Sequence, residues 1–212
     1  MTLQLTSYVV CLEPKISVLP NFLSPEECTH LIDLAEQVGF SQSLVGRGSY
    51  SNSSSFSNQI STNRTSQSVT LDPRADRVVS EIELRLAGLV GLPVEHLESL
   101  VVVKYLPGQL FNDHHDGTFR SHTVFLYLNQ VAAGGETRFP NLGLRIKPSM
   151  GAAVLWRNTM LDGSEDSRTV HAGLPPEGCV KFGVNCFFNQ DRVREEGVSV
   201  CISNEDVISA GS

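Results

Sequence analysis

Val180-Lys181-Phe182-Gly183-Val184-Asn185-Cys186-Phe187-Phe188 is the most informative run of this sequence, because its side chains fall into two sets with a period of two. Successive side chains of a β-strand point to opposite faces of a sheet. One face would carry Val180, Phe182, Val184, Cys186 and Phe188, and the other Lys181, Gly183, Asn185 and Phe187. The run therefore predicts a strand that carries one lysine on an inward face.

Short apolar runs bounded by Gly and Pro fill the rest of the second half of the chain. They are Leu100–Leu106, Thr123–Asn129, Leu144–Lys147, Ala152–Trp156 and Thr169–His171. Two helices are predicted before them. The first has Ser24 as its cap, Pro25 in its first turn and Glu27 completing a capping box, and it ends at Gly39. The second begins at Asp72-Pro73 and ends near Gly91, with an apolar stripe of Ala75, Val78, Val79, Ile82 and Leu86.

Helices followed by many short strands predict an α+β chain, mainly β, whose core is a small jelly roll. With 212 residues and 41% hydrophobic content, the chain is long enough for one sizeable core, so a single domain over 1–212 is expected. The stretch Ser41 to Ser68 is rich in Ser, Asn and Gly and predicts a long mobile loop, either functional or disordered, with a short strand near Ser61–Ser66. Val198–Ile202 alternates and predicts an edge strand.

Composition argues against several classes of partner and location. The net charge is −7 and no run of Lys or Arg occurs, which disfavours nucleic acid and anionic membranes as partners. Five cysteines without a Cys-x-x-Cys pair disfavour a disulfide framework or a zinc ribbon. No signal peptide or membrane span is predicted. We therefore expect a cytoplasmic protein, with a secretory compartment left open if a leader segment has been removed.

Three residues of the types that bind iron stand in the strand-rich half. His114 and Asp116 are two apart, so an extended segment projects both to one side and turns His115 away. His171 would come from another strand that the sheet brings alongside. Two imidazoles and one carboxylate on one face of a metal are the ligand set of non-haem Fe(II) oxygenases. The same ligands also suit zinc, which would activate water for hydrolysis.

The inward lysine favours iron over zinc. A buried ammonium is costly unless an anion neutralises it. A dicarboxylate that chelates the iron at one end would meet Lys181 with its far carboxylate, and Gly183 beside it leaves room. Tyr105, at the end of a strand and on the same face as Val103, could donate a second hydrogen bond to that carboxylate.

Together these residues resemble the prolyl 4-hydroxylase family of Fe(II)/2-oxoglutarate dioxygenases, over a span from about Phe22 to Phe188. The matching motifs are Tyr105-Leu106-Pro107-Gly108-Gln109, His114-His115-Asp116, Gly134 to Pro140, Asp162-Gly163, Arg168 to Gly173 and Lys181. The resemblance implies a double-stranded β-helix core at about 98–190, with supporting helices and a substrate-lid loop at about 20–97. It implies Fe(II) on His114, Asp116 and His171, and 2-oxoglutarate on Tyr105 and Lys181. It also implies O2 as co-substrate and ascorbate as reductant.

The resemblance further implies where the substrate binds. Arg64 and Ser66 match an Arg-x-Ser segment behind a closing loop, and Glu98 matches an acidic position near the substrate groove. Phe187 stands where a Trp is common beside the peptide channel, and Phe111 where Tyr is frequent. The implied reaction hydroxylates a C–H bond, foremost peptidyl-proline at C4, and releases succinate and CO2. The alternatives are a hydroxylase of a free amino acid or small metabolite, and a catalytically idle jelly roll that binds a ligand. The sequence does not predict the oligomeric state.

Overall fold

The computed structural model describes residues 6–47 and 57–195, and two antiparallel sheets dominate them. The larger sheet has eight strands and the smaller has four. In order across the larger sheet, the strands are β1 (Tyr8–Cys11), β2 (Ile16–Leu19), β13 (Ala153–Arg157), β9 (Arg120–Tyr127), β16 (Lys181–Asn189), β7 (Val101–Tyr105), β6 (Gln67–Thr70) and β3 (Ser41–Gln42). In order across the smaller sheet, they are β12 (Leu144–Ile146), β11 (Thr137–Phe139), β14 (His171–Gly173) and β8 (Phe111–His114).

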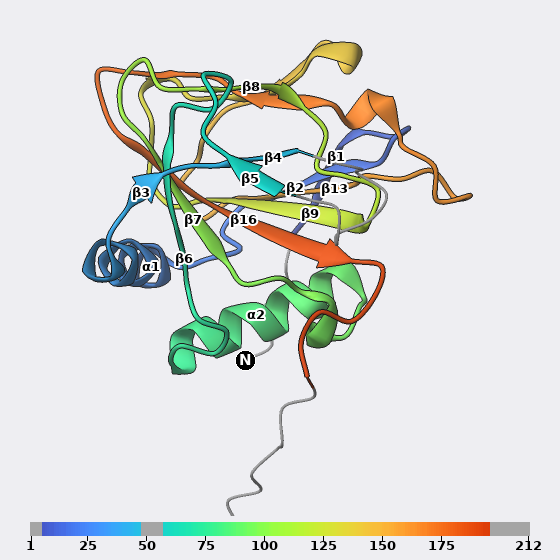
Figure 1. Ribbon diagram of the computed structural model, residues 1–212, viewed down its shortest axis with the longest axis horizontal. Helices are drawn as coiled ribbons and strands as arrows, with labels where there is room; N and C mark the ends of the chain where they lie inside the picture. The colour runs from blue at the N-terminus through green and yellow to red at the C-terminus, as the bar shows by residue number, and fades with distance from the viewer. Residues whose placement is uncertain (1–5, 48–56, 196–212) are drawn as a thin grey trace, which may run out of the picture.

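The remaining elements are short and lie around this core (Figure 1). Two further two-stranded ladders pair β4 (Val45–Arg47) with β5 (Ser57–Gln59), and β10 (Ala133–Gly134) with β15 (Pro176–Glu177). Single turns of 3-10 helix lie at η2 (Val94–His96), η3 (Pro140–Leu142) and η4 (Ser167–Thr169). None of the helices in the described part of the chain is long and apolar enough to cross a membrane.

The two sheets pack face to face around an aromatic core. Val103 of β7 and Phe125 of β9 contribute from the larger sheet, and Phe139 of β11 closes the core from the smaller one. Phe139 meets Trp156 of β13 edge-on, with ring centroids 5.3 Å apart. Burying aromatic rings of this size contributes much of the free energy that holds two sheets together. This packing confirms the predicted jelly roll.

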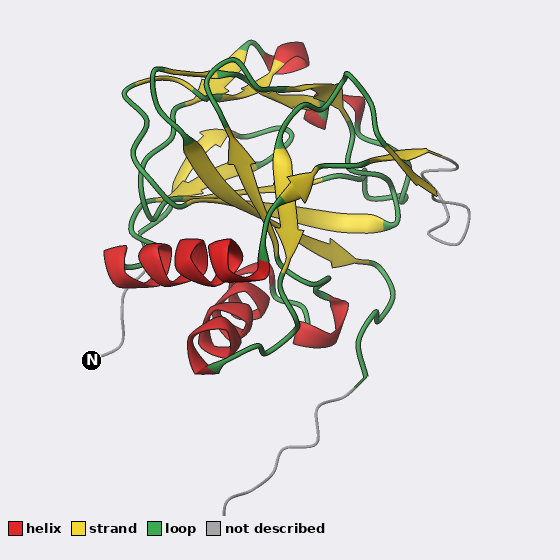
Figure 2. Cartoon of the chain, turned by 60° about the vertical axis from the view of Figure 1, so that its left-hand side comes forward, coloured by secondary structure: helices red, strands yellow, loops and turns green. Residues whose placement is uncertain are grey.

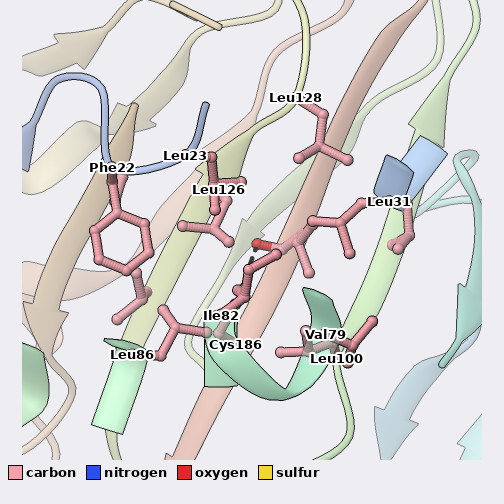
Figure 3. Close-up of a cluster of buried hydrophobic side chains, with 14 of the residues drawn as sticks. Phe22, Leu23, Leu31, Val79, Ile82, Leu86, Leu100, Leu126, Leu128 and Cys186 are labelled. Carbon is pink, nitrogen blue, oxygen red and sulfur yellow. Dashed lines mark hydrogen bonds between the residues drawn. The ribbon is translucent and has the colours of Figure 1, made fainter. Parts of the chain in front are cut away.

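Two helices cover the other face of the larger sheet, as Figure 2 shows beneath the strands. Helix α1 (Pro25–Val38) buries Leu31, and α2 (Arg77–Val90) buries Ile82 and Leu86. These side chains meet strand residues such as Leu126 and Cys186 in the cluster of Figure 3. Neighbouring residues divide between the two cores, because side chains alternate along a strand: Val102 faces the helices and Val103 the smaller sheet.

The first helix follows its predicted bounds. Ser24 accepts a hydrogen bond from the Glu27 amide at 3.2 Å, and the Glu27 carboxylate accepts one from the Ser24 amide at 2.8 Å. Both halves of the capping box are therefore present. The second helix differs, because α2 begins at Arg77 rather than at Asp72-Pro73. Asp76 caps it through the Val79 amide at 2.8 Å, and Arg74 has a φ of 56° that no helix allows.

Several strands differ from the sequence prediction. The stretch Ser61–Ser66 forms a tight turn closed by a bridge between Ser61 and Arg64, and the strands near it are β5 and β6. The predicted strand at Thr169–His171 is a 3-10 turn followed by β14. Strands β1, β2, β3 and β6 extend the larger sheet with residues before the expected core at about 98–190. The predicted edge strand at Val198–Ile202, and the middle of the Ser41 to Ser68 loop, lie outside the described residues.

Candidate active site

The smaller sheet brings the three predicted metal ligands together. His114 ends β8 and His171 begins β14, and the two are cross-strand partners. Asp116 follows two residues after β8, with Oδ1 at 3.6 Å from His114 Nε2 and Oδ2 at 3.7 Å from His171 Nε2. The three candidate ligand atoms all lie within 4.8 Å of one another. In the described part of the chain, this is the one group of His, Cys, Asp or Glu side chains with such geometry.

Backbone carbonyls orient both imidazoles. His114 Nδ1 donates to the Asn112 carbonyl at 2.8 Å, and His171 Nδ1 donates to the Thr169 carbonyl at 3.0 Å. A carbonyl only accepts, so each Nδ1 carries the proton and each Nε2 keeps a lone pair for a metal. Burial, reinforced by His171, lowers the pKa of His114 to about 3, which keeps this ring neutral.

The carboxylate of the group is ionised. Burial opposes ionisation of Asp116, but His171, His114 and Arg120, together with a hydrogen bond from Thr123, hold its pKa below the usual value. Two imidazole nitrogens and one carboxylate grouped together form a donor set that fits Fe(II). These residues would hold the ion and leave its cavity side free for other ligands.

Aromatic rings fix the histidines in place. Phe111 stacks on His114 with centroids 3.5 Å apart and an interplanar angle of 14°. Trp156 meets His171 edge-on at 4.8 Å. Because both imidazoles are enclosed by rings, their χ angles have little freedom, and the site is organised before any metal binds.

A hydrogen-bonded chain of buried side chains supports Asp116, and sequence reasoning did not identify it. Thr123 donates to Asp116 Oδ2 at 2.7 Å and accepts from Asn158 Nδ2 at 2.9 Å. Asn158 Oδ1 in turn accepts from Trp156 Nε1 at 2.9 Å. His115 lies outside the ligand set, since its Nε2 donates to the Asn158 carbonyl at 2.9 Å. No local signal marks such a chain, because its members come from different segments.

Replacing Thr123 by valine tests this support. The side chain keeps its shape but can no longer donate to Asp116, so we expect iron affinity to fall by roughly 10- to 100-fold with the fold retained. Iron titration of the metal-free protein measures the change, and circular dichroism monitors the fold. Thr29→Val removes a comparable hydroxyl from the exposed side of α1, where it bonds the Pro25 carbonyl, and serves as the control. Unchanged iron affinity in Thr123→Val would show that Asp116 needs no such support.

Lys181 is fully enclosed beside this triad. It is 1% exposed and faces Tyr105 across the β16–β7 ladder. Its Nζ lies 5.0 Å from the ring centroid of Tyr105, 5.1 Å from that of Phe125 and 5.5 Å from that of Tyr127. Burial lowers the pKa of Lys181 to about 7, although Glu136 opposes this shift. No described residue forms an ion pair with it, so aromatic faces surround the ammonium and Glu136 acts on it only from beyond contact distance.

Glycines make room around the lysine and the tyrosine. A Cβ on Gly173 would lie 3.2 Å from the Tyr105 hydroxyl, and one on Gly135 would lie 3.3 Å from Lys181 Cδ. Gly135 also has a φ of +73°, which side chains rarely adopt. The slot that remains carries an ammonium and a phenol, and burial raises the pKa of that phenol. A slot with these donors and no acid of its own fits an anionic ligand such as the far carboxylate of 2-oxoglutarate.

A cavity of about 600 Å³ is lined by two of the three candidate ligands, His114 and Asp116, whereas His171, Tyr105 and Lys181 are not part of its wall. Arg64 and Phe187 line it, as predicted for substrate residues, while Ser66 is fully buried behind the wall. Arg64 lies over the Phe111 ring at 4.6 Å and donates through Nη1 to the Leu44 carbonyl at 3.1 Å. The remainder of the wall is mostly uncharged and polar, and includes Ser41, Gln42, Gln59, Ser61, Asn63, Ser68, Thr70, Asn112 and Asn185.

Glu98 does not line this cavity. It holds Arg120, which does, through two bonds of 2.7 Å, from Nε to Oε1 and from Nη2 to Oε2. Asn189 Nδ2 donates to the same carboxylate at 2.6 Å. Arg120 lies 3.8 Å over the Phe187 ring and donates through Nη1 to the Asp116 carbonyl at 3.3 Å. Sequence reasoning missed Arg120, because only the fold brings it to Glu98.

Comparison with known proteins agrees with this geometry. A family model described as the 2OG-Fe(II) oxygenase superfamily matches residues 100–189. The chain is 34% identical over 178 residues to "Probable prolyl 4-hydroxylase 11" of Arabidopsis thaliana, and 31% identical over 194 residues to "Prolyl 4-hydroxylase 2" of the same plant. These alignments cover 77% of this chain in both cases. The chain spans just under two thirds of these relatives, 63% of the length of each.

Solved structures show the same architecture. The viral collagen prolyl hydroxylase of Paramecium bursaria Chlorella virus-1, solved as a 2OG complex, superposes with a TM-score of 0.67 at 25% identity. That superposition covers 84% of this chain and 97% of the viral one. A prolyl-4-hydroxylase of Pseudomonas putida shares the fold, with a TM-score of 0.56 at 18% identity over 83% of this chain and 92% of the bacterial one.

Proposed function

Since this chain belongs to the 2OG-Fe(II) oxygenase superfamily, we propose that it is a prolyl 4-hydroxylase-like dioxygenase that hydroxylates proline within an extended peptide. The observation that carries the proposal is a His-Asp-His group beside a buried lysine with no ion-pair partner among the described residues. Fe(II), with O2 as the oxidant and 2-oxoglutarate as the co-substrate that is oxidised, would supply the chemistry of C–H hydroxylation: one oxygen atom goes to the substrate and the other to succinate, and CO2 is released. We propose ascorbate as the reductant that keeps the iron ferrous.

The protein's own residues would bind and orient. His114, Asp116 and His171 would hold the iron, and Lys181 with Tyr105 would hold the far carboxylate of 2-oxoglutarate. Phe111, Phe139 and Trp156 surround the imidazoles and keep bulk water from one side of the site. Arg120 and Phe187 would place the substrate on the cavity side. Such placement supplies much of the rate enhancement when a cofactor performs the bond-breaking step.

The cavity supports a peptide rather than a free amino acid as substrate. Its wall includes uncharged polar residues of β6 and β3 as well as residues next to His114 and Asp116, so it offers hydrogen-bonding groups from several elements within about 600 Å³. Arg64 is held by the Leu44 carbonyl and by Ser66 Oγ, at 3.1 and 3.2 Å, while its buried Nη2 has no hydrogen-bond partner among the described residues and is available to a substrate carbonyl. Relatives named prolyl 4-hydroxylases fit this assignment.

Mass spectrometry of products tests the proposal. The protein is incubated with Fe(II), 2-oxoglutarate and ascorbate, either with proline-rich peptides or with free amino acids. We expect succinate release to rise with peptide, and one oxygen to be gained on a proline of that peptide. Oxygen gain on the free amino acid alone would favour a small-molecule hydroxylase. No succinate under any condition, from protein that binds iron, would favour an idle binding domain.

The lysine slot predicts a pH dependence. The pKa of Lys181 in the ligand-free protein is lowered to about 7 by burial. Above that pH the ammonium has lost its proton, so binding a dianion requires proton uptake. The apparent affinity for 2-oxoglutarate should then weaken by at most about tenfold for each pH unit above 7. The affinity for 2-oxoglutarate is measured from pH 6 to 9 for the wild type and for Lys181→Met. The variant should show a smaller change of affinity with pH, and equal slopes for both proteins would contradict this role of Lys181.

A further inference from the structure

Arg194 follows β16 in the chain and lies between helix α2 and Glu98, the residue that holds Arg120. Its Nη1 is 2.9 Å from Oε1 of Glu83, a helix residue that is 1% exposed. Its Nη2 donates to the backbone carbonyl of Glu98 at 2.7 Å. The arginine side chain is itself only 10% exposed. One guanidinium therefore links the helix layer to the backbone of Glu98.

The same segment is fastened by its backbone. The amides of Val193 and Arg194 donate to the Glu95 carbonyl at 2.8 and 3.0 Å. The Glu98 amide donates to the Phe187 carbonyl at 2.8 Å, which fixes the other side of Glu98 to β16. Glu98 is thus held through both its amide and its carbonyl, so its side chain has a defined origin.

Because the Glu98 backbone is fixed, its carboxylate fixes the direction of Arg120, which lines the cavity. The carboxylate grips Arg120 with two bonds, and Arg120 contacts both the Phe187 ring and the Asp116 carbonyl. A side chain that grips a partner in a fork fixes that partner's direction as well as its charge. A shift of the Glu98 backbone would therefore turn Arg120 relative to the cavity and to the metal ligand.

The buried ion pair of Arg194 and Glu83 is not explained by its contribution to the free energy of unfolding. Two buried charges cost desolvation, and an uncharged pair of similar volume is often as stable. Neither Glu83 oxygen has a partner with hydrogen-bond alignment. The feature that an uncharged pair could not reproduce is the bond from Arg194 to the Glu98 carbonyl.

We propose that Arg194 and Glu83 are positioning residues, which hold the Glu98 backbone and thereby aim Arg120 into the substrate cavity. The effect on substrate rests on the proposed function, whereas the effect on Arg120 does not. Neither residue lines the cavity that His114 and Asp116 line, and Arg194 lies instead with Glu98 in a neighbouring hollow. They act only through Glu98 and Arg120.

Three variants test the relay. Arg194→Lys keeps a cation near Glu83 but lacks the second guanidinium nitrogen that donates to the Glu98 carbonyl. The double variant Glu83→Leu/Arg194→Met removes both buried charges and preserves packing, so that loss of stability can be separated from loss of positioning. Arg77→Gln is the matched control, because it breaks the exposed Arg77–Glu81 pair on the same helix. Thermal unfolding establishes that each variant is folded before it is assayed.

The first readout needs no substrate. The Nε–H of Arg120, held by Glu98 at 2.7 Å, should exchange slowly with solvent in a ¹⁵N-labelled protein. We expect the Arg120 Nε–H to exchange faster in Arg194→Lys and in the double variant than in the wild type. In Arg77→Gln it should exchange at the wild-type rate. Unchanged exchange in both relay variants overturns the proposal, whatever reaction the protein performs.

The second readout is kinetic. The peptide KM should rise about tenfold in Arg194→Lys, as expected for a lost charge-assisted hydrogen bond, and by a larger factor than the KM for 2-oxoglutarate. In an Arg120→Gln background, Arg194→Lys should add nothing, because both act through one group. Additive effects would overturn the relay. A wild type without peptide-dependent turnover would refute the proposed function instead, and the Arg120 exchange rates would still decide the relay.

Discussion

Replacing His171 by alanine should leave the protein without bound iron and without any turnover of 2-oxoglutarate, with or without peptide. His171 is buried, and its Nε2 lies 3.7 Å from Asp116 Oδ2 in the candidate ligand set. Losing a group that merely supports a ligand typically costs 10- to 100-fold in metal affinity, so losing the ligand itself should exceed about 100-fold. The iron content of purified protein and the release of succinate measure the two effects.

His115→Gln is the control for this variant. The residue adjoins the ligand His114, but its Nε2 donates to the Asn158 carbonyl and its Nδ1 accepts from the Gly117 amide. It should therefore retain iron at the wild-type ratio. If His171→Ala kept its iron while His115→Gln lost it, the ligand assignment would be wrong.

Replacing Lys181 by methionine should raise the 2-oxoglutarate KM by roughly 10- to 150-fold, the equivalent of losing one charge-assisted contact of 1.5–3 kcal/mol. The methionine fills a similar volume between the rings of Tyr105, Phe125 and Tyr127, so iron binding should persist. The comparison variant Lys147→Met removes a lysine that is exposed to solvent and should leave the KM unchanged. A normal KM in Lys181→Met would refute the anion slot.

The same substitution should stabilise the ligand-free protein. The folded-state pKa of Lys181 is about 7 against an ordinary 10.5, so between these values the unfolded chain binds more protons than the folded one. The free energy of unfolding of the wild type therefore rises with pH across that window. Lys181→Met lacks this slope and should be more stable than the wild type at pH 7 and below. Urea unfolding at several pH values measures both curves.

Local signals in the sequence predicted the elements that local chemistry determines. The capping box at Ser24 fixes the start of α1. The alternation along β16 places Lys181 on the face opposite to Val184 and Cys186, which pack against the helices. The prediction of α2 failed at its start, because a Pro followed by a left-handed Arg74 makes a turn before the true cap, Asp76. Strand β2, which is second from one edge of the larger sheet, has only four residues, too few for an alternation like that of β16.

The candidate site divides in the same way. The ligands follow from residue type and spacing, and the structure brings all three together. The groups that support them do not, because the bond that joins Thr123 to Asn158, 35 residues apart, exists only in the tertiary fold. Glu98 shows the difference most clearly. The family resemblance predicted it near the substrate groove, whereas the structure places it outside the cavity wall and bonded to Arg120, through strands brought together by packing.

The cross-strand pairing of His114 with His171 has a consequence for how the smaller sheet holds together. Strands β8 and β14 have only four and three residues, and the ladder between them is already interrupted by an irregular register. An ion bound by both would act as a staple across these two short strands, because binding to the folded form alone stabilises it. A slip of one residue would turn a histidine outward and remove the staple. Metal uptake and correct strand alignment are thus coupled, and the protein should not bind the ion while its smaller sheet is misassembled.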